Sequence, residues 1–265
     1  MTLTSDQDNA IIYSLPAEPE AQLAAESYLH ELGVFVCEGL DKAGYKFCSG
    51  NVMAQNPRWC QPVAVWKQYF SNWINLPEPR QLLEFNIFFD FRPVYGSVEL
   101  AQELRRHVFG ELRAQPAFYP HFAQNSLLFK PPTRLLGRII SGGAGGDHPG
   151  SLDLKDALMP LVSFARLYAL RLEMDDTHTT NRVEALVEHD VLQESSGQEI
   201  LTAYDFLMRL RLHHQASKLA SGQVADNTIN YRGLGQTERT LLNQSFAQIT
   251  AVQKRISYDF LGGTV

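Results

Sequence analysis

Residues 4–13 read TSDQDNAIIY, a run in which a polar half passes into an apolar half. This order is typical of a strand that enters a hydrophobic core, and Pro16 ends it. Asp6 and Asp8 lie two residues apart on the expected strand. Because positions i and i+2 of a strand share a face, we expect both carboxylates to point to the same place.

Two carboxylates held close together repel each other unless a cation lies between them. Mg²⁺ and Mn²⁺ prefer such oxygen ligands and complete their shells with water and substrate phosphates. A third acid, Asp90, ends the apolar run FNIFFDF of residues 85–91, which we interpret as a strand buried on both faces. Two strands of one sheet could bring all three acids to one edge, where two metal ions would activate a hydroxyl and neutralise phosphate charge.

Each of these acids also has a plainer interpretation. An Asp-x-Asp near a terminus is commonly a solvated turn or a helix cap. For Asp90 the alternative is an ion pair with Arg92 or with another arginine.

The composition describes a folded chain of 265 residues, enough for one large domain or two ordinary ones. Its net charge of −6 argues against a protein that grips nucleic acid. No apolar stretch is long enough to span a membrane, and the polar start, Met1 to Asn9, does not fit a signal peptide, so we expect a cytoplasmic protein. The three cysteines fit no zinc spacing, and we interpret them as buried or half-buried thiols.

The remainder of the first half reads mainly as helices. Apolar residues recur at helical spacing from Glu18 to about Ala43, with Gly44 placed to end the helix. A second helix begins at Pro62 and contains Trp66 and Trp73, which we assign to core packing instead of a base-stacking platform. Further helices are expected after a Ser97 cap and over residues 116–129.

Pro131 and Pro132 mark the expected boundary between a domain of residues 1–130 and one of residues 131–265. After it, segments 135–140 and 152–154 flank a Gly-rich stretch and predict a hairpin-like connection. Four helical segments follow, with Thr237 as the N-cap of the last: Asp153–Met174, Asn181–His189, Gly197–Ala220 and Thr237–Leu261. The fold class is therefore α+β: a mixed sheet with flanking helices, then an all-α bundle that is antiparallel by default.

The run of residues 4–13 resembles the central strand of the nucleotidyltransferase superfamily that includes kanamycin nucleotidyltransferase and DNA polymerase β. More narrowly, it resembles the nucleotidyltransferases attached to cyclic-nucleotide-binding and CBS domains in bacterial signalling proteins, relatives of the uridylyltransferase that modifies the PII nitrogen-regulatory protein. The resemblance continues in GNVMA of residues 50–54 with the nearby Asn56-Pro57 and Trp59-Cys60, in FFDFR of residues 88–92 with Val94-Tyr95-Gly96, and in LMRLRLHHQ of residues 207–215. It covers nearly the whole chain.

The resemblance implies a role for each candidate residue. Asp6, Asp8 and Asp90 would ligate Mg²⁺ or Mn²⁺, and Asp90 would also help to deprotonate the acceptor hydroxyl. Asn9 and Asn51 would lie near a nucleoside triphosphate. The C-terminal bundle would be the substrate-binding domain, and the acceptor would be a protein or a small molecule.

Basic residues are the other candidates for contact with the substrate. Arg92 and Lys155 are assigned this role, and the alternative for Lys155, as for Arg166 on the same expected helix, is an ion pair with an acid. On the helix of residues 197–220, a basic patch is expected to contact phosphate or a protein, or else to form ion pairs with acids such as Asp205 and Glu199; its members are Arg209, Arg211, His213 and His214.

One departure from the family pattern concerns the N-terminus. The superfamily places a Gly-Ser at a helix N-terminus shortly before the paired carboxylates to hold nucleotide phosphates, and this family adds an Arg and a Glu. The sequence begins inside that motif. We therefore expect weak transfer or none from this chain. The alternative is a non-catalytic regulatory or protein-binding module that keeps the fold, with or without attached sensor domains.

Overall fold

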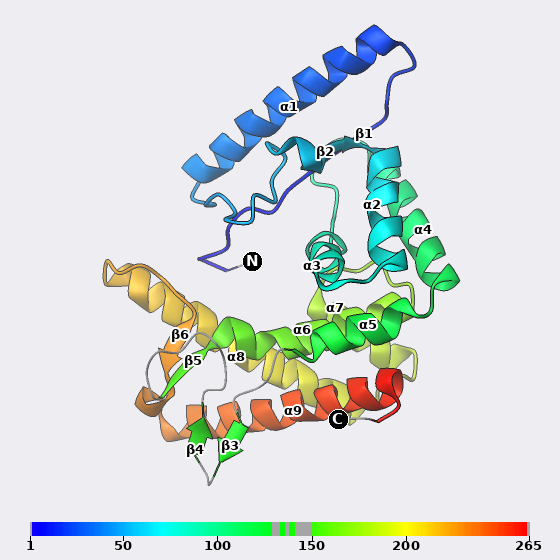
Figure 1. The fold of residues 1–265 in the computed structure, drawn as a ribbon. Coiled ribbons are helices and arrows are strands. Elements are labelled where there is room, and N and C mark those ends of the chain that lie inside the picture. The colour runs from blue at the N-terminus through cyan, green and yellow to red at the C-terminus, as the bar shows by residue number, and fades with distance from the viewer. Residues whose placement is uncertain (1, 129–132, 136–137, 141–149, 264–265) are drawn as a thin grey trace. The chain divides into compact units, whose positions relative to one another are not determined.

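The computed structural model describes residues 2–128, 133–135, 138–140 and 150–263 (Figure 1). The chain divides into two compact units, Met1–Phe118 and Tyr119–Val265. The domain boundary that we expect between residues 130 and 131 lies outside the described residues. Within the described part, none of the helices has an apolar stretch sufficient to cross a membrane.

The first unit contains a two-stranded parallel sheet. Strand β1 (Ile11–Tyr13) pairs with β2 (Cys60–Pro62) (Figure 1). The chain is already extended before β1, where Gln7 forms an isolated parallel bridge with Phe47. The strand predicted over residues 6–13 is therefore confirmed in part. Among the described residues this sheet is smaller than the mixed sheet that we expected.

The helices of this region begin and end where local signals place them. Ser97 Oγ accepts a hydrogen bond from the Leu100 N–H and caps α4, and Gly44, with φ of 103°, follows the end of α1. The segments of helix are α1 (Pro19–Lys42), the 3₁₀ turn η1 (Pro57–Trp59), α2 (Val63–Asn75), α3 (Pro79–Phe88) and α4 (Val98–Ala114). Helix α5 (Phe118–Ser126) begins at the boundary and belongs, except for its first residue, to the second unit.

The strand predicted over residues 85–91 is wrong. These residues form the second half of α3 and the turn that follows it. A short, wholly apolar run fits a buried helix as well as a buried strand, and the Pro at N1 of α3 favours the helix. The helix buries Leu82, Phe85 and Phe88, which recur every third residue on one face.

Aromatic side chains dominate the core of the first unit. Trp66 and Trp73 are each 3% exposed, and Trp59 stacks on Trp66 with 5.8 Å between ring centroids. The assignment of Trp66 and Trp73 to core packing is therefore confirmed. The three cysteines are free; Cys37 and Cys60 are buried and Cys48 is half-buried, as we expected.

A polar ladder joins α2 and α4. Its rungs are hydrogen bonds that recur every four residues in both helices: Lys67 to Glu103, Ser71 to His107, and Asn75 to Glu111. Because the residue numbers rise together, the two helices run parallel with one helical face against the other. The ladder holds α4, and the turn before it, beside the aromatic core.

Helix α1 buries little of its apolar surface. Only Gly33 and Cys37 are buried among its residues, whereas Leu23, Tyr28 and Phe35 are 65–74% exposed. The apolar residues that predict this helix therefore do not all mark its core-facing side. Its contact with the unit is made through the small residues Gly33 and Cys37, which allow a close approach to the segment of residues 52–54.

The second unit is the expected helical bundle. Its helices α6 (Leu154–Arg171), α7 (Thr179–Glu188), α8 (Glu194–Ala220) and α9 (Gln236–Leu261) pack against one another. The expected N-cap of α9 is wrong. Gly235 occupies the cap, and its own N–H donates to the Glu238 carboxylate over 2.8 Å, while Thr237 lies inside the first turn.

Short strands accompany the bundle. Strand β3 (Thr133–Leu135) pairs with β4 (Arg138–Ile140), and β5 (Ser151–Asp153) pairs with β6 (Thr228–Asn230), both antiparallel. The expected hairpin-like pairing across the Gly-rich stretch is wrong, because β5 takes its partner from a distant part of the chain. Residues 141–149 of that stretch lie outside the described residues.

Candidate functional site

The segment before β1 alternates between buried and exposed side chains. Gln7 is 5% exposed, and its side-chain amide donates to the carbonyl oxygens of Cys37 and Tyr45 over 3.0 and 3.1 Å. Asp6 and Asp8, on either side of it, are both exposed. The alternation expected for an extended segment is therefore present, and the two carboxylates share the outward face.

Asn9 continues the buried face of this segment. Its Oδ1 accepts hydrogen bonds from the Ala54 N–H over 2.8 Å and from the Cys37 thiol, and its Nδ2 donates to Gln7 Oε1. The Asn9 backbone N–H donates to the Val52 carbonyl oxygen. Asn9 thus ties the carboxylate segment to the chain before η1, and its contact with a nucleotide stays a prediction.

Asp8 lies beside the loop that carries Asn51. Burial raises the pKa of the Cys48 thiol, and the hydrogen bond that this thiol makes to the Asp8 carboxylate raises it further. Asn51, three residues on, has φ of 53° and is exposed, while its carbonyl oxygen accepts from Asn56 Nδ2 and Trp59 Nε1. The structure therefore brings Asp8 and the Asn51 loop to one place through Cys48.

Asp90 occupies a different setting from the expected one. It is half-buried in the turn after α3, and the exposed Arg92 follows it. The buried Arg105 of α4 holds this turn, donating to the carbonyl oxygens of Phe89 and Phe91 over 2.6 and 2.8 Å. Arg105 therefore fixes the backbone of the turn on both sides of Asp90.

The expected carboxylate triad is not gathered. Among the described residues no group of three His, Cys, Asp or Glu side chains is placed to hold a metal ion. The geometry offers the outward pair of Asp6 and Asp8, and Mg²⁺ is commonly held by one or two carboxylates together with substrate phosphates. The pair fits that mode of binding, whereas Asp90 as a third ligand stays a prediction.

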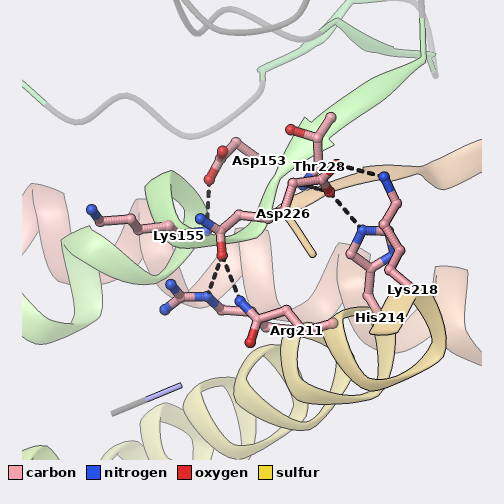
Figure 2. A network of polar contacts seen from close by, with 9 residues as sticks. Asp153, Lys155, Arg211, His214, Lys218, Asp226 and Thr228 are labelled. Atoms are coloured by element: carbon pink, nitrogen blue, oxygen red, sulfur yellow. Dashed lines mark hydrogen bonds and ion pairs between the residues drawn. The ribbon is translucent and has the colours of Figure 1, made fainter. Parts of the chain in front are cut away.

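A second polar cluster lies in the bundle, between the end of α8 and the chain that leads into β6 (Figure 2). One carboxylate oxygen of Asp226 accepts from His214 Nε2 over 2.8 Å and from the Thr228 N–H, and the other accepts from Lys218 Nζ. Partial burial opposes the charge, but these donors outweigh it and lower the pKa of Asp226 to about 2.

We expect this cluster to lose stability in acid. The folded pKa of Asp226 lies below its ordinary value, so its contribution is present above pH ~4 and is lost as the pH falls toward ~2. Because the side chain is 44% exposed, solvent screening reduces the contribution to about 1 kcal/mol. Amide hydrogen exchange of β6 and the last turn of α8, measured at pH 5 and pH 2.5, checks this.

The matched variants are Asp226→Asn and Asp190→Asn, the second being an exposed acid after α7. Asp226→Asn should show fast exchange at both pH values, and Asp190→Asn should behave as the wild type. A wild-type pH dependence in Asp226→Asn would contradict the assignment.

The same cluster fixes Arg211. Its Nε donates to Asn227 Oδ1 over 2.7 Å, and the fully buried Gln215 donates to the same oxygen over 2.9 Å. The Asn227 carbonyl oxygen accepts the Leu154 N–H at the start of α6. Asn227 therefore joins the end of α8 to the start of α6.

Lys155 lies in the first turn of α6. Its backbone N–H donates to Asp153 Oδ1, which also accepts from the Asp156 N–H and so caps the helix. The Lys155 side chain is exposed, and Figure 2 shows it extending away from Asp153. The sequence prediction of Lys155 as a substrate contact is not tested by this geometry.

Two members of the basic patch of α8 form pairs with acids. Arg209 forms an ion pair with Asp205 at 2.8 Å, as one interpretation of the sequence has it. Glu199 instead accepts from Gln248 of α9. His214 pairs with Asp226, which the sequence analysis did not single out.

Sequence reasoning missed several residues of both clusters. In the first unit it missed Gln7 and Cys48, which have no charge pattern to mark them. In the bundle it missed Asp226 and Asn227, since the run 223–230 contains no motif. A polar run of the form Asp-Asn-Thr before an apolar strand residue is a usable turn signal, but it does not say which helix the side chains meet.

Comparisons with known proteins give two family matches. The model described as "Putative nucleotidyltransferase DUF294" matches residues 1–80. The model described as "Putative nucleotidyltransferase substrate binding domain" matches residues 116–260. Asp6, Asp8, Asn9 and Asn51 lie in the first range and Lys155 in the second, whereas Asp90 and Arg92 lie in neither. No curated protein matches the chain. The two matches together indicate nucleotidyl transfer.

Proposed function

The chain belongs to the family described as "Putative nucleotidyltransferase substrate binding domain", and from this premise we propose that it is a module for nucleotidyl transfer. The reaction would move a nucleoside monophosphate from a nucleoside triphosphate to a hydroxyl of a protein or small molecule. In that reaction the acceptor oxygen bonds to the α-phosphorus, pyrophosphate leaves, and the hydroxyl proton passes to a base. The observation that carries the proposal is the outward pair of Asp6 and Asp8 inside the first matched range.

The paired carboxylates by themselves repel a triphosphate. Asp6 and Asp8 would therefore hold Mg²⁺ or Mn²⁺, which when bound neutralises charge on the phosphates. Gln7 and Asn9 keep the two acids on the exposed face because their own amides are committed to the fold. Asn51, exposed in the adjoining loop, is proposed to contact the nucleotide.

Further parts of the proposal concern context. We propose a role in bacterial signal transduction, in a cytoplasmic protein related to uridylyltransferases of the PII protein and to families with CBS or cyclic-nucleotide-binding domains. The support is the sequence resemblance at residues 4–13, 50–60, 88–96 and 207–215. Asp90 is proposed as the base for the acceptor hydroxyl, and Arg92 and Lys155 as substrate contacts.

One observation favours a second candidate function. No three-carboxylate group is present among the described residues, and a two-metal transferase needs more ligands than one pair supplies. A regulatory module that binds nucleotide or protein without turnover requires only the fold and the exposed pair.

Calorimetric titration of the full chain with the four nucleoside triphosphates, with and without Mg²⁺, tests the first proposal. We expect saturable, Mg²⁺-dependent binding of at least one of them. Asp8→Asn should weaken it roughly tenfold or more, about 1.4 kcal/mol, because half of the paired negative charge is lost while the hydrogen-bond acceptor for Cys48 is kept.

Asp190→Asn, which makes the same change at an exposed acid of the other unit, should bind as the wild type does. Binding that needs no Mg²⁺ and survives Asp8→Asn would refute the metal site. Binding without any transfer to an added hydroxyl acceptor supports the regulatory module. A loss in Asp90→Asn would identify that acid as part of the site.

A further inference from the structure

The guanidinium of Arg211 is held in one orientation. Its Nε donates to Asn227 Oδ1, which also accepts a hydrogen bond from Gln215 Nε2. The backbone of Asn227 is held as well, because its carbonyl oxygen accepts from the Leu154 N–H at the start of α6. Fixing Nε leaves the two terminal nitrogens as a fork that points out of the network (Figure 2). A fork of this kind matches two oxygens of a phosphate group.

Within the described residues, the terminal nitrogens of Arg211 have no hydrogen-bonded or ion-paired partner. Partial burial lowers the pKa of Arg211, and attraction to Asp153 and Tyr204 only partly opposes this. A half-buried cation without a direct counter-ion costs free energy, so its retention calls for a ligand. The other cations of α8 have counter-ions: Arg209 pairs with Asp205, and Lys218 with Asp226.

Lys155 supplies a second cation on the neighbouring helix. Its ammonium has no hydrogen-bonded or ion-paired partner among the described residues, and Figure 2 shows its side chain and the Arg211 guanidinium ending on the same side of the network. Asp153 spends Oδ1 on two backbone N–H groups of the α6 N-terminus. Burial raises the pKa of the Asp156 carboxyl, and the attraction between Asp156 and Lys155 only partly opposes this, but no ion pair joins the two among the described residues.

We propose that Arg211 and Lys155 form an anion site that takes a phosphate group, with Arg211 binding two of its oxygens and Lys155 a third. Assignment of that phosphate to the acceptor substrate rests on the proposed function, whereas phosphate binding itself does not. Asp153 and Asp156 lie in the same turn of α6 and weaken the site, so we expect a Kd for inorganic phosphate on the order of 1 mM.

The test is a titration of the full chain with inorganic phosphate, followed by ¹H–¹⁵N spectra that include arginine Nε–Hε groups. The Arg211 Nε–Hε resonance should shift with saturation in the wild type. Arg211→Gln should weaken binding roughly tenfold or more, and the exposed Lys155→Gln roughly threefold. Arg209→Gln, an equal charge change two residues earlier on the same helix, should leave the Kd unchanged.

An equal Kd in the wild type and Lys155→Gln, an equal loss in Arg209→Gln, or no saturable shift at 20 mM phosphate would each overturn the site. Lys155→Gln keeps the test decisive if Arg211→Gln does not fold, because Lys155 is exposed. Asp8→Asn should leave phosphate binding intact, so failure of the proposed transfer function is distinguishable from failure of this site.

The source of the phosphate is tested with two ligands. Ribose 5-phosphate should compete with inorganic phosphate in the wild type and lose affinity in Arg211→Gln. Binding of Mg²⁺-nucleoside triphosphate should not change in that variant. If nucleoside triphosphate binding is the one that depends on Arg211, the assignment to the acceptor is wrong.

Discussion

Arg105→Ala is expected to lower the free energy of unfolding of the first unit by about 3 kcal/mol. Arg105 is 6% exposed, and its two terminal nitrogens donate to the carbonyl oxygens of Phe89 and Phe91. Its guanidinium also stacks on Phe91, 3.9 Å from the ring centroid. The substitution leaves two carbonyl groups without their donors and opens a cavity against the aromatic core.

The consequence reaches the candidate site through the backbone. Phe89 and Phe91 flank Asp90, so Arg105 fixes the turn that carries this acid. Arg105→Lys keeps the charge but presents a compact ammonium that cannot span both carbonyls. We expect it to lose roughly half as much stability as Arg105→Ala.

Urea unfolding followed by tryptophan fluorescence measures this cleanly. All three tryptophans, Trp59, Trp66 and Trp73, lie in the first unit, so the signal reports that unit alone. The control is Arg106→Ala, at an exposed arginine one position later, which should change stability by no more than ~0.5 kcal/mol. Equal midpoint shifts for the two variants would show that Arg105 has no special role.

Sequence patterns predict the helices of the second unit well, and α9 is the plainest case, with Leu242, Phe246 and Ile249 on one buried face and Gly262 after its end. The first unit is harder. Residues 85–91 are apolar throughout, and such a run has no period to separate strand from helix. What decides it is tertiary: Phe88 meets Trp66 and Trp73 of α2, and Phe85, on the same face of α3, meets Phe70 of α2.

The candidate site divides in the same way. The shared face of Asp6 and Asp8 follows from the local alternation of side chains, and in the structure both carboxylates are exposed while Gln7 between them is buried. The Arg211 fork depends on Asn227, which is sixteen residues away and directly precedes β6, the strand that pairs with β5. No local pattern encodes that pairing, since the partner strand is chosen by where α8 ends and by how the bundle packs. Long-range contacts of this type lie beyond single-sequence reasoning.

Gly33→Ala is the last of the large effects that we expect. A Cβ at Gly33 would lie 2.5 Å from the Ala54 carbonyl oxygen and 2.8 Å from its carbonyl carbon. Both are backbone atoms and cannot rotate away, so α1 must separate from residues 52–54. Overpacking of this kind costs about 1–3 kcal/mol, and the better helix propensity of alanine offsets about 1 kcal/mol of it. We expect a net loss of about 1–2 kcal/mol.

Gly39→Ala in the same helix is the matched control, because a Cβ there would meet nothing within 4 Å. It should stabilise the unit by about 0.5–1 kcal/mol through helix propensity alone, so the two variants are expected to have opposite signs in the same fluorescence assay. Stabilisation by both would mean that α1 does not press on residues 52–54 in solution. The Ala54 N–H also donates to Asn9, which lies next to Asp8. A Gly33→Ala chain that stays folded should therefore bind nucleoside triphosphate more weakly, whereas Gly39→Ala should bind it as the wild type does. That result would show that the close approach of α1 helps to hold Asp6 and Asp8 in place.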